Sequence, residues 1–440
     1  MPMQTSGRAA LAAALLALGL AAIHPLFGEG WGGATAPPVV HSENRADSAA
    51  AESRHYVVLV SLDGFRWDYA KRDGAAHLLA LGKEGAWAPE GMLPSYPSQT
   101  FPNQVAMVTG LYPEHNGIVA NNFFDPERQA RFAMADAKDT ADGTWYSGVP
   151  LWSLAETQGM RTACIFWPGC DAEIAGYRPT YSVRIGGKMD DAARVRQVLL
   201  WLRLPAAERP HFIAVCFSEP GRAGEEFGPD APQTEAAVRR MDAIVGELKA
   251  GLDKTGLPID LVVVSGAGMA KAQDGWITLG QYANLTGFET DGDLLYGKTE
   301  QDRERVYNEL KHVSSLFMVY RRKNVPADLH YNANPREGDP VAIATGPYAM
   351  RAQGPEAGHS DRPPTMGMHG FDPRVVPEMK AIFFAAGPDI VPGKTVAPFD
   401  NVNLYPWISH ILGLKAPKSD GSLNVLAGTL RDDGVDTASR

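Results

Sequence analysis

Short apolar runs rich in β-branched residues recur along the chain, at residues 56–61, 212–217, 261–265, 316–320 and 381–385. Continuous runs of this length predict strands in a sheet that is covered on both faces. Between residues 233 and 252, hydrophobic residues recur at helical spacing, which predicts an amphipathic helix. Strands that alternate with helices in this way favour a layered α/β fold.

Three of the predicted strands end in segments that could contribute to a binding site. These segments are Leu62-Asp63-Gly64-Phe65, Ser218-Glu219-Pro220-Gly221 and Gly266-Ala267-Gly268-Met269. In sheets of this kind, ligands bind at the carboxyl ends of the strands. We therefore expect these three strand ends to meet at one site.

A hydroxyl residue precedes another predicted helix. Thr100 comes just before Phe101 and Pro102, and residues 104–109 can continue as a helix. Proline is favoured in the first helical turn, where the free N–H groups and the helix dipole favour an anion. Thr100 is thus suited to act as an alkoxide nucleophile beside a phosphoryl group, although an ordinary capped helix explains the same residues.

The N-terminal segment has the pattern of a targeting signal. Arg8 precedes an uncharged, Ala- and Leu-rich run, and Ala34-Thr35-Ala36 offers a small-residue cleavage site. We expect a signal peptide over residues 1–36, with an uncleaved anchor as the alternative, and a polar linker over 37–54. No later run of about 18 apolar residues follows. The expected location is therefore periplasmic or secreted, with no stable membrane span after cleavage.

Composition narrows the class of protein. Of the 440 residues, 45% are hydrophobic and 21% are charged, which is typical of a globular chain. The net charge of −10 argues against a nucleic-acid partner. Three cysteines exclude a disulfide scaffold. Cys164 and Cys170 are either one disulfide or two buried thiols, and Cys216 is expected to pack within a core strand.

Several motifs, taken in order, resemble the nucleotide pyrophosphatase/phosphodiesterase family of the alkaline phosphatase superfamily. They lie at residues 60–66, 100–103, 109–121, 166–169, 208–210, 227–229, 368–372, 377–379 and 420–423. The resemblance implies an alkaline-phosphatase-like three-layer α/β/α fold with a mixed central sheet and a small insertion over the site. We expect this domain to span 55–426, followed by a tail over 427–440. The Gly-, Pro- and charge-rich stretch 332–362 is expected to form long loops or a small insertion.

The resemblance also implies an extracytoplasmic hydrolase with two zinc ions. Thr100 matches the family's nucleophile, and Asn121 matches the residue that steadies the phosphoryl oxygens. Asp63 matches a ligand of the zinc that binds the nucleophile, and His369 matches a ligand of the other zinc. In such two-metal sites one ion activates the attacking oxygen and the other stabilises the leaving oxygen.

The remaining zinc-ligand positions depart from the family. The motif Pro-Asp-x-x-Gly-His reads Pro220-Gly221-Arg222-Ala223-Gly224-Glu225 here, and Ser-Asp-His-Gly-Met reads Ser265-Gly266-Ala267-Gly268-Met269. Gly221, Gly266 and Ala267 offer no side-chain donor, and Glu225 replaces a histidine. Zinc takes four ligands, or three and a water molecule. We therefore expect no cofactor at full two-zinc occupancy.

These losses predict a phosphodiesterase-like protein that is catalytically impaired or inactive, with a small phosphate ester or nucleotide as its ligand. One alternative is an active hydrolase with a rebuilt site for one zinc or other divalent metal, formed by Asp63, Glu225 and His369. Thr100 would be the nucleophile of that site. The other alternative is a non-catalytic protein that uses the cleft to bind a different ligand.

Overall fold

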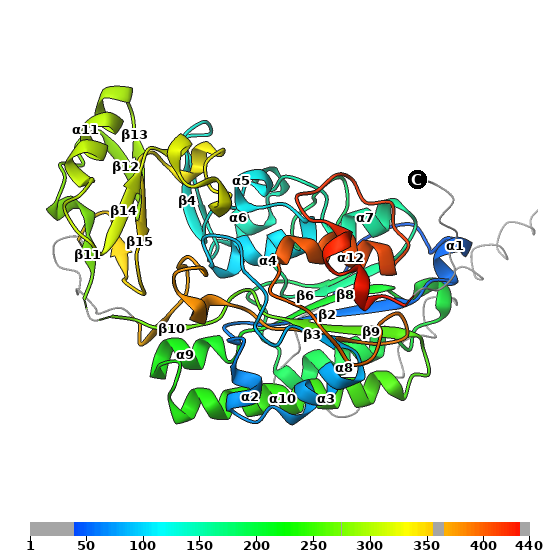
Figure 1. Cartoon of the computed structure of the whole chain (residues 1–440). Helices are drawn as coiled ribbons and strands as arrows, with labels where there is room; N and C mark the ends of the chain where they lie inside the picture. The colour runs from blue at the N-terminus through cyan, green and yellow to red at the C-terminus, as the bar shows by residue number, and fades with distance from the viewer. Residues whose placement is uncertain (1–38, 274, 355–364, 432–440) are drawn as a thin grey trace, which may run out of the picture. The chain divides into compact units, whose positions relative to one another are not determined.

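The computed structural model of the chain describes residues 39–273, 275–354 and 365–431. The predicted signal peptide and most of the predicted tail lie outside these ranges. The described residues form a nine-stranded sheet between two layers of helices (Figure 1). In spatial order its strands are β1 (Val40–His41), β7 (Tyr181–Val183), β6 (Thr162–Ile165), β8 (Phe212–Phe217), β2 (Tyr56–Leu62), β9 (Ile259–Val264), β18 (Phe383–Ala386), β3 (Ala86–Trp87) and β19 (Lys394–Thr395).

The middle of this sheet explains the continuous apolar runs in the sequence. Strand β2 pairs in parallel with β8 and β9, and all seven of its residues are buried. Strand β18 pairs antiparallel with β9, so the sheet is mixed. The strands predicted at 56–61, 212–217, 261–265 and 381–385 are therefore confirmed to within a few residues. So is the mixed α/β fold.

Helices cover both faces of the sheet, each over its own hydrophobic core (Figure 1). One layer contains α4 (Thr100–Thr109), α5 (Pro113–Asn116), α6 (Ala137–Ala141), α7 (Leu151–Thr157) and α12 (Leu404–Ile411). The other contains α2 (Tyr69–Arg72), α3 (Ala76–Glu84), α8 (Asp191–Trp201), α9 (Gly221–Phe227) and α10 (Pro232–Asp253). Helix α10 is the helix predicted between 233 and 252. Its buried residues include Val238, Val245 and Leu252, which form the apolar stripe.

A separate set of short strands forms a lobe with its own core. It comprises β11 (Ile277–Thr278), β12 (Phe288–Asp291), β13 (Leu294–Gly297), α11 (Glu300–Leu310), β14 (Phe317–Tyr320), β15 (Val341–Ala344) and β16 (Met350–Arg351). Leu295, Val306 and Phe317 are among the residues of its core. The run 316–320 is thus a strand, but the prediction that both its faces are covered was wrong, because Met318 on β14 is 48% exposed. The lobe also begins well before residue 332.

Two further antiparallel strand pairs and the chain ends complete the described structure. The hairpin of β4 (Asn122–Asp125) and β5 (Ala130–Ala133) is one pair, and β10 (Ala270–Lys271) with the distant β17 (Gly367–Met368) is the other. Within the segment predicted as a linker, β1 joins the sheet through β7, and α1 (Ala49–Glu52) follows it. Within the segment predicted as a tail, Thr429 accepts a hydrogen bond from the indole of Trp407. Residues on the outer side of each predicted boundary therefore contact the domain.

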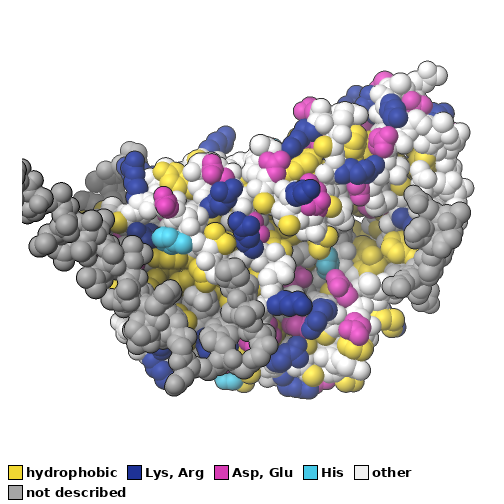
Figure 2. Space-filling model, turned by 180° about the vertical axis from the view of Figure 1, so that it is seen from behind, with side chains coloured by type: hydrophobic (Ala, Val, Ile, Leu, Met, Phe, Trp, Pro, Cys, Tyr) yellow, Lys and Arg dark blue, Asp and Glu magenta, His cyan; other side chains and the backbone are white. Residues whose placement is uncertain are grey.

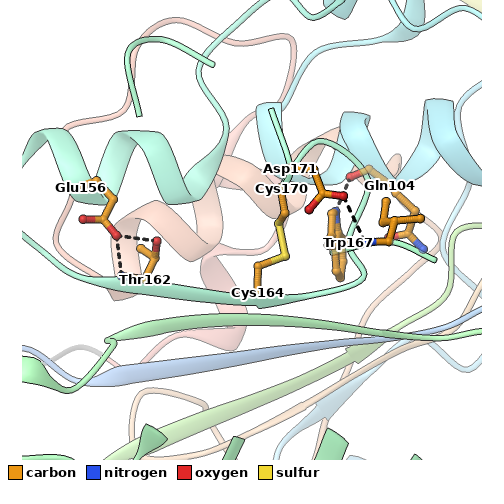
Figure 3. Close-up of a disulfide and its surroundings, with 8 residues drawn as sticks. Gln104, Glu156, Thr162, Cys164, Trp167, Cys170 and Asp171 are labelled. Atoms are coloured by element: carbon orange, nitrogen blue, oxygen red, sulfur yellow. Dashed lines mark hydrogen bonds between the residues drawn. A yellow bond between two sulfur atoms is a disulfide. The ribbon is translucent and has the colours of Figure 1, made fainter. Parts of the chain in front are cut away.

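Cys164 and Cys170 form a disulfide at the end of β6 (Figure 3). The bond closes the loop that carries Trp167, whose indole N–H donates to the backbone oxygen of Gln104 at 3.1 Å. The disulfide alternative for these two cysteines is therefore the one that the structure adopts. The loop is consequently fixed against helix α4.

The charge on the molecular surface is mixed in sign. On the face shown in Figure 2, acidic and basic side chains intermingle, and no continuous basic stripe runs across the atoms that are drawn in colour. Among the described residues, no helix is long and apolar enough to cross a membrane.

Candidate functional site

The carboxyl ends of the central parallel strands meet at one edge of the sheet, as the sequence predicts. Asp63 follows β2, Gly221 begins α9 after β8, and Gly266 follows β9. The backbone N–H of Gly221 donates to the backbone oxygen of Asp63 at 2.7 Å. Gly64 has a positive φ of 66°, and a Cβ there would come within 2.4 Å of Gly221 Cα. A glycine at position 64 thus permits the close approach of the two loops.

Helix α4 brings Thr100 to this edge. Thr100 is the first residue of the helix, and its hydroxyl donates to Asp63 Oδ1 at 3.3 Å. The side chain of Asn121 accepts a hydrogen bond from the N–H of Phe101 at 2.9 Å. The N–H of Asn121 in turn donates to the side chain of Gln99 at 2.7 Å. Asp63, Thr100 and Asn121 are therefore held in one connected cluster at a helix N-terminus.

His369 and Glu225 form a pair close to this cluster. His369 follows β17, Glu225 belongs to α9, and His369 Nε2 lies 3.6 Å from Glu225 Oε1. The other ring nitrogen of His369, Nδ1, is buried and has no hydrogen-bond partner. The structure thus brings together the site residues that the family resemblance selected.

Electrostatics couple the three ionisable groups of this site. Burial raises the pKa of Asp63, and the charge of Glu225 adds to that increase, whereas His369 and the Thr100 hydroxyl act in the opposite direction. Burial lowers the pKa of His369, but its interactions with Glu225 and Asp63 outweigh burial, so the net pKa is raised. The two neighbouring carboxylates therefore favour the protonated form of His369.

Three of the positions that the family resemblance assigns to zinc ligands carry no side-chain donor. Gly221 and Gly266 have no side chain, and a Cβ at Gly221 would lie only 3.3 Å from Asp63 Oδ2. A Cβ at Gly266 would lie 3.4 Å from the side-chain nitrogen of Gln104. That nitrogen donates to the hydroxyl of Ser61 at 2.6 Å, and both side chains are buried. The hydrogen-bonded pair of Gln104 and Ser61 therefore lies beside position 266, to which the family resemblance assigns a metal ligand.

The alternative one-metal site depends on the spacing of three ligand atoms. Among the described residues, one group of three His, Cys, Asp or Glu side chains has ligand atoms that all lie within 4.8 Å of one another, and it is elsewhere in the fold. Asp63, Glu225 and His369 do not form such a group. We derive no catalytic step through a metal at this edge.

A cavity of about 270 Å³ opens beside Thr100. Its wall includes Asp63, Thr100, Phe101, Gln104, Phe166, Pro168, Ile185, Arg194, Cys216 and Phe217. The Arg194 guanidinium lies 4.7 Å from the ring centre of Phe166 and 5.2 Å from that of Phe217. No sequence signal indicated Arg194, because it comes from α8, far along the chain. Cys216 belongs to the central strand β8 and packs against the main core, as expected, and its partly buried side chain also lines the cavity.

An α/β/α sandwich with an Asp–Thr pair at the carboxyl edge of its mixed sheet defines the alkaline-phosphatase-like class of folds. The family model for type I phosphodiesterase / nucleotide pyrophosphatase matches residues 57–372. An uncharacterised pyrophosphatase/phosphodiesterase of Schizosaccharomyces pombe is 34% identical over 387 residues, which cover 83% of this chain and 78% of the relative. The chain belongs to the type I phosphodiesterase / nucleotide pyrophosphatase family.

Other relatives agree with this assignment. Ectonucleotide pyrophosphatase/phosphodiesterase family member 1 of Rattus norvegicus is 33% identical over 392 residues. The matched region covers 84% of this chain and 42% of that longer protein. The solved structure of murine family member 5 superposes with a TM-score of 0.79 at 27% identity, covering 86% of this chain and all of that one. A second structure of the murine protein is an inactive variant in complex with AMP, with the same TM-score.

Proposed function

We propose that this chain is a pseudoenzyme of its family, which retains the fold and the ligand pocket but not the two-zinc hydrolysis of phosphodiesters. The observation that carries the proposal is the absence of side-chain donors at Gly221, Gly266 and Ala267. Each missing ligand lowers metal affinity, and loss of even a supporting partner costs about 10–100-fold. Ser265 and Met269, which flank two of these positions, are buried within the fold, which supports an intact pocket rather than a damaged fold.

The ligand that we propose is a small phosphate ester, with a nucleoside monophosphate as the first candidate. Thr100 is the first residue of α4, where the helix dipole favours an anion, and Asn121 is hydrogen-bonded beside it. A protonated His369 would offset the charge of Asp63. Aromatic rings and Arg194 in the adjoining cavity suit a flat organic group. Murine family member 5, which shares the fold, is described with AMP.

The site also supports a non-catalytic binding function for a ligand that is not a phosphate. Asp63 and Glu225 lie close to the pocket without a metal to neutralise them, which favours a cationic or neutral ligand over a polyanion. Titration calorimetry with AMP, inorganic phosphate and neutral sugars separates the two ligand classes. Binding of AMP that weakens in Arg194→Ala supports the phosphate-ester ligand, whereas binding of a neutral sugar alone supports this alternative.

The loss of hydrolysis is tested with a nitrophenyl phosphodiester and added zinc. We expect the wild-type rate to equal that of Thr100→Ala, the matched control for a threonine nucleophile. Zinc-dependent turnover that disappears in Thr100→Ala would overturn the proposal. If turnover instead disappears in Glu225→Ala, the rebuilt one-metal hydrolase is the better description.

The four ligand positions can also be restored together, as Gly221→Asp, Glu225→His, Gly266→Asp and Ala267→His. The Gly266 side has room, since a Cβ there makes only an ordinary contact of 3.4 Å with Gln104, whereas a Cβ at Gly221 lies 3.0 Å from a backbone oxygen and requires a small shift. We expect zinc-dependent hydrolysis to appear in this variant and to vanish again on Thr100→Ala. A folded, zinc-loaded but inert variant would show that these positions do not explain the loss.

The proposed location is periplasmic or extracellular. The disulfide between Cys164 and Cys170 supports an oxidising compartment. Fractionation of cells that express the full chain tests this, with N-terminal sequencing of the product to locate cleavage near residue 36.

A further inference from the structure

A cluster of three potential metal ligands lies far from Thr100. His55, Asp260 and Asp389 each offer a ligand atom, and these atoms all lie within 4.8 Å of one another. His55 directly precedes β2, Asp260 is the second residue of β9, and Asp389 follows β18, which runs antiparallel to them. The cluster therefore stands at the amino-terminal edge of the strands whose carboxyl edge carries Asp63.

The contacts within the cluster leave one buried oxygen without a partner. His55 Nδ1 lies 2.7 Å from Asp389 Oδ2, and the backbone N–H of Asp389 donates to Asp260 Oδ1 at 3.1 Å. Asp260 has no exposed surface, and its Oδ2 accepts no hydrogen bond. A buried carboxylate oxygen without a donor is costly, so such an oxygen in a native site calls for a missing partner.

The surrounding backbone holds the cluster in place. A Cβ at Gly387 would lie 2.3 Å from Asp260 Oδ1, so the turn that carries Asp389 runs directly against Asp260. All three side chains extend from central strands or their immediate ends, which position ligands better than free loops do. The side chains of His55 and Asp389 are 34% and 16% exposed, which gives an ion a path from solvent.

The geometry points to a binding site for one divalent transition-metal ion, formed by His55, Asp260 and Asp389. One imidazole nitrogen and two carboxylates suit zinc, manganese or iron. Three protein ligands leave a position for water, and metal–ligand bonds of about 2.0–2.2 Å place neighbouring ligand atoms about 3.3 Å apart. The distance of 2.7 Å between His55 Nδ1 and Asp389 Oδ2 is shorter than that value, and the ligand atoms of the cluster are at most 4.8 Å apart. This site shares no residue with the Thr100 pocket and does not depend on the proposed function.

Calorimetric titration of the full, chelator-treated chain with zinc chloride tests the site. We expect one ion to bind, and binding to weaken by about 100-fold or more in His55→Gln and in Asp260→Asn. The matched control is His369→Ala, which removes a metal-ligand candidate at the opposite edge and is expected to leave this binding unchanged. Cobalt titration followed by visible absorption gives a second readout of a bound ion.

Distinct outcomes would overturn the site. Absence of zinc binding by the wild-type chain leaves a proton shared between the two carboxyl groups as the explanation of the cluster. Binding that persists in Asp260→Asn but is lost in His369→Ala would assign the ion to the Thr100 pocket. Two bound ions, of which only one is lost in Asp260→Asn, would support this site and count against the pseudoenzyme. His55 is partly exposed, so His55→Gln keeps the test valid even if Asp260→Asn fails to fold.

Discussion

At the scale of single residues, the residue types at positions 221, 266 and 267 decide which donor atoms the site offers to a ligand. The sequence alone does not mark Gln104 as a site residue, yet its side chain donates a hydrogen bond to Ser61 and lies beside Gly266. The motif comparison could identify the positions without a metal-ligating side chain, because the residue type alone shows this. It could not identify the hydrogen bond between Gln104 and Ser61, because Ser61 lies on a strand 43 residues earlier in the chain.

Glu337 is the buried acid whose pKa gives the clearest pH prediction. It has no exposed surface, and neither carboxylate oxygen has a hydrogen-bond partner. Burial raises its pKa to about 9, and the charge of Glu114 adds to the increase. The folded chain therefore keeps this proton up to about pH 9, whereas the unfolded chain releases it near pH 4.5. Stability is consequently lost as the pH rises through that window.

The substitution Glu337→Gln removes this titration. We expect its melting temperature to match wild type near pH 4.5 and to exceed it at pH 8, with a gain in unfolding free energy of at most about 6 kcal/mol at pH 9. Calorimetric melts across the range provide the measurement. Glu226→Gln, at an exposed position, is the control and should change nothing. An equal difference in melting temperature between Glu337→Gln and wild type at both pH values would contradict the raised pKa of Glu337.

At the scale of elements, the sequence predicts the buried strands well and the lobe poorly. Strands β2, β8 and β9 are covered on both faces, so their residues are apolar throughout and stand out in the pattern. Strands β12 and β13 in the lobe pair with each other and are shorter and only partly buried, so no pattern marks them. Pairing between distant segments, such as β1 with β7, leaves no local signal at all.

The disulfide is the element-scale feature with a direct stability prediction. Cys164 and Cys170 are buried and six residues apart, and the loop between them carries Trp167 (Figure 3). Closure of such a short loop stabilises a chain by roughly 2 kcal/mol in the chain-entropy model. We expect the double variant Cys164→Ser/Cys170→Ser to lose about that much unfolding free energy in urea titrations. Cys216→Ser is the matched control, and an unchanged midpoint in the double variant would refute the expectation.

At the scale of the whole molecule, the first described residues belong to the domain. The carboxylate of Asp47 accepts a hydrogen bond from the N–H of Arg161 at 2.6 Å, and the N–H of Ser48 donates to the backbone oxygen of Gly159. Together with the pairing of β1 and β7, these contacts fix the segment to the sheet. Composition alone favoured a linker because the segment is polar and rich in Ala and Ser.

Removal of this segment is therefore expected to destabilise the fold. A chain that begins at His55 loses several backbone hydrogen bonds, each worth about 0.5–1.5 kcal/mol, so its unfolding free energy should fall by about 2–4 kcal/mol. A chain that begins at Pro38 is the control and should unfold at the same urea concentration as the full chain. Equal urea midpoints for the two truncations would indicate that residues 38–54 act only as a linker and do not stabilise the domain.

The half-buried thiol of Cys216 has a practical consequence for the study of this pocket. The chain has three cysteines, two of them are joined, and the remaining one lines the cavity beside Thr100. Burial raises its pKa, and the charge of Asp63 adds to that, so thiol reagents should label it slowly and faster at alkaline pH. A molecule that fills the cavity should shield the thiol, so the labelling rate reports occupancy directly, without turnover and without knowledge of the ligand.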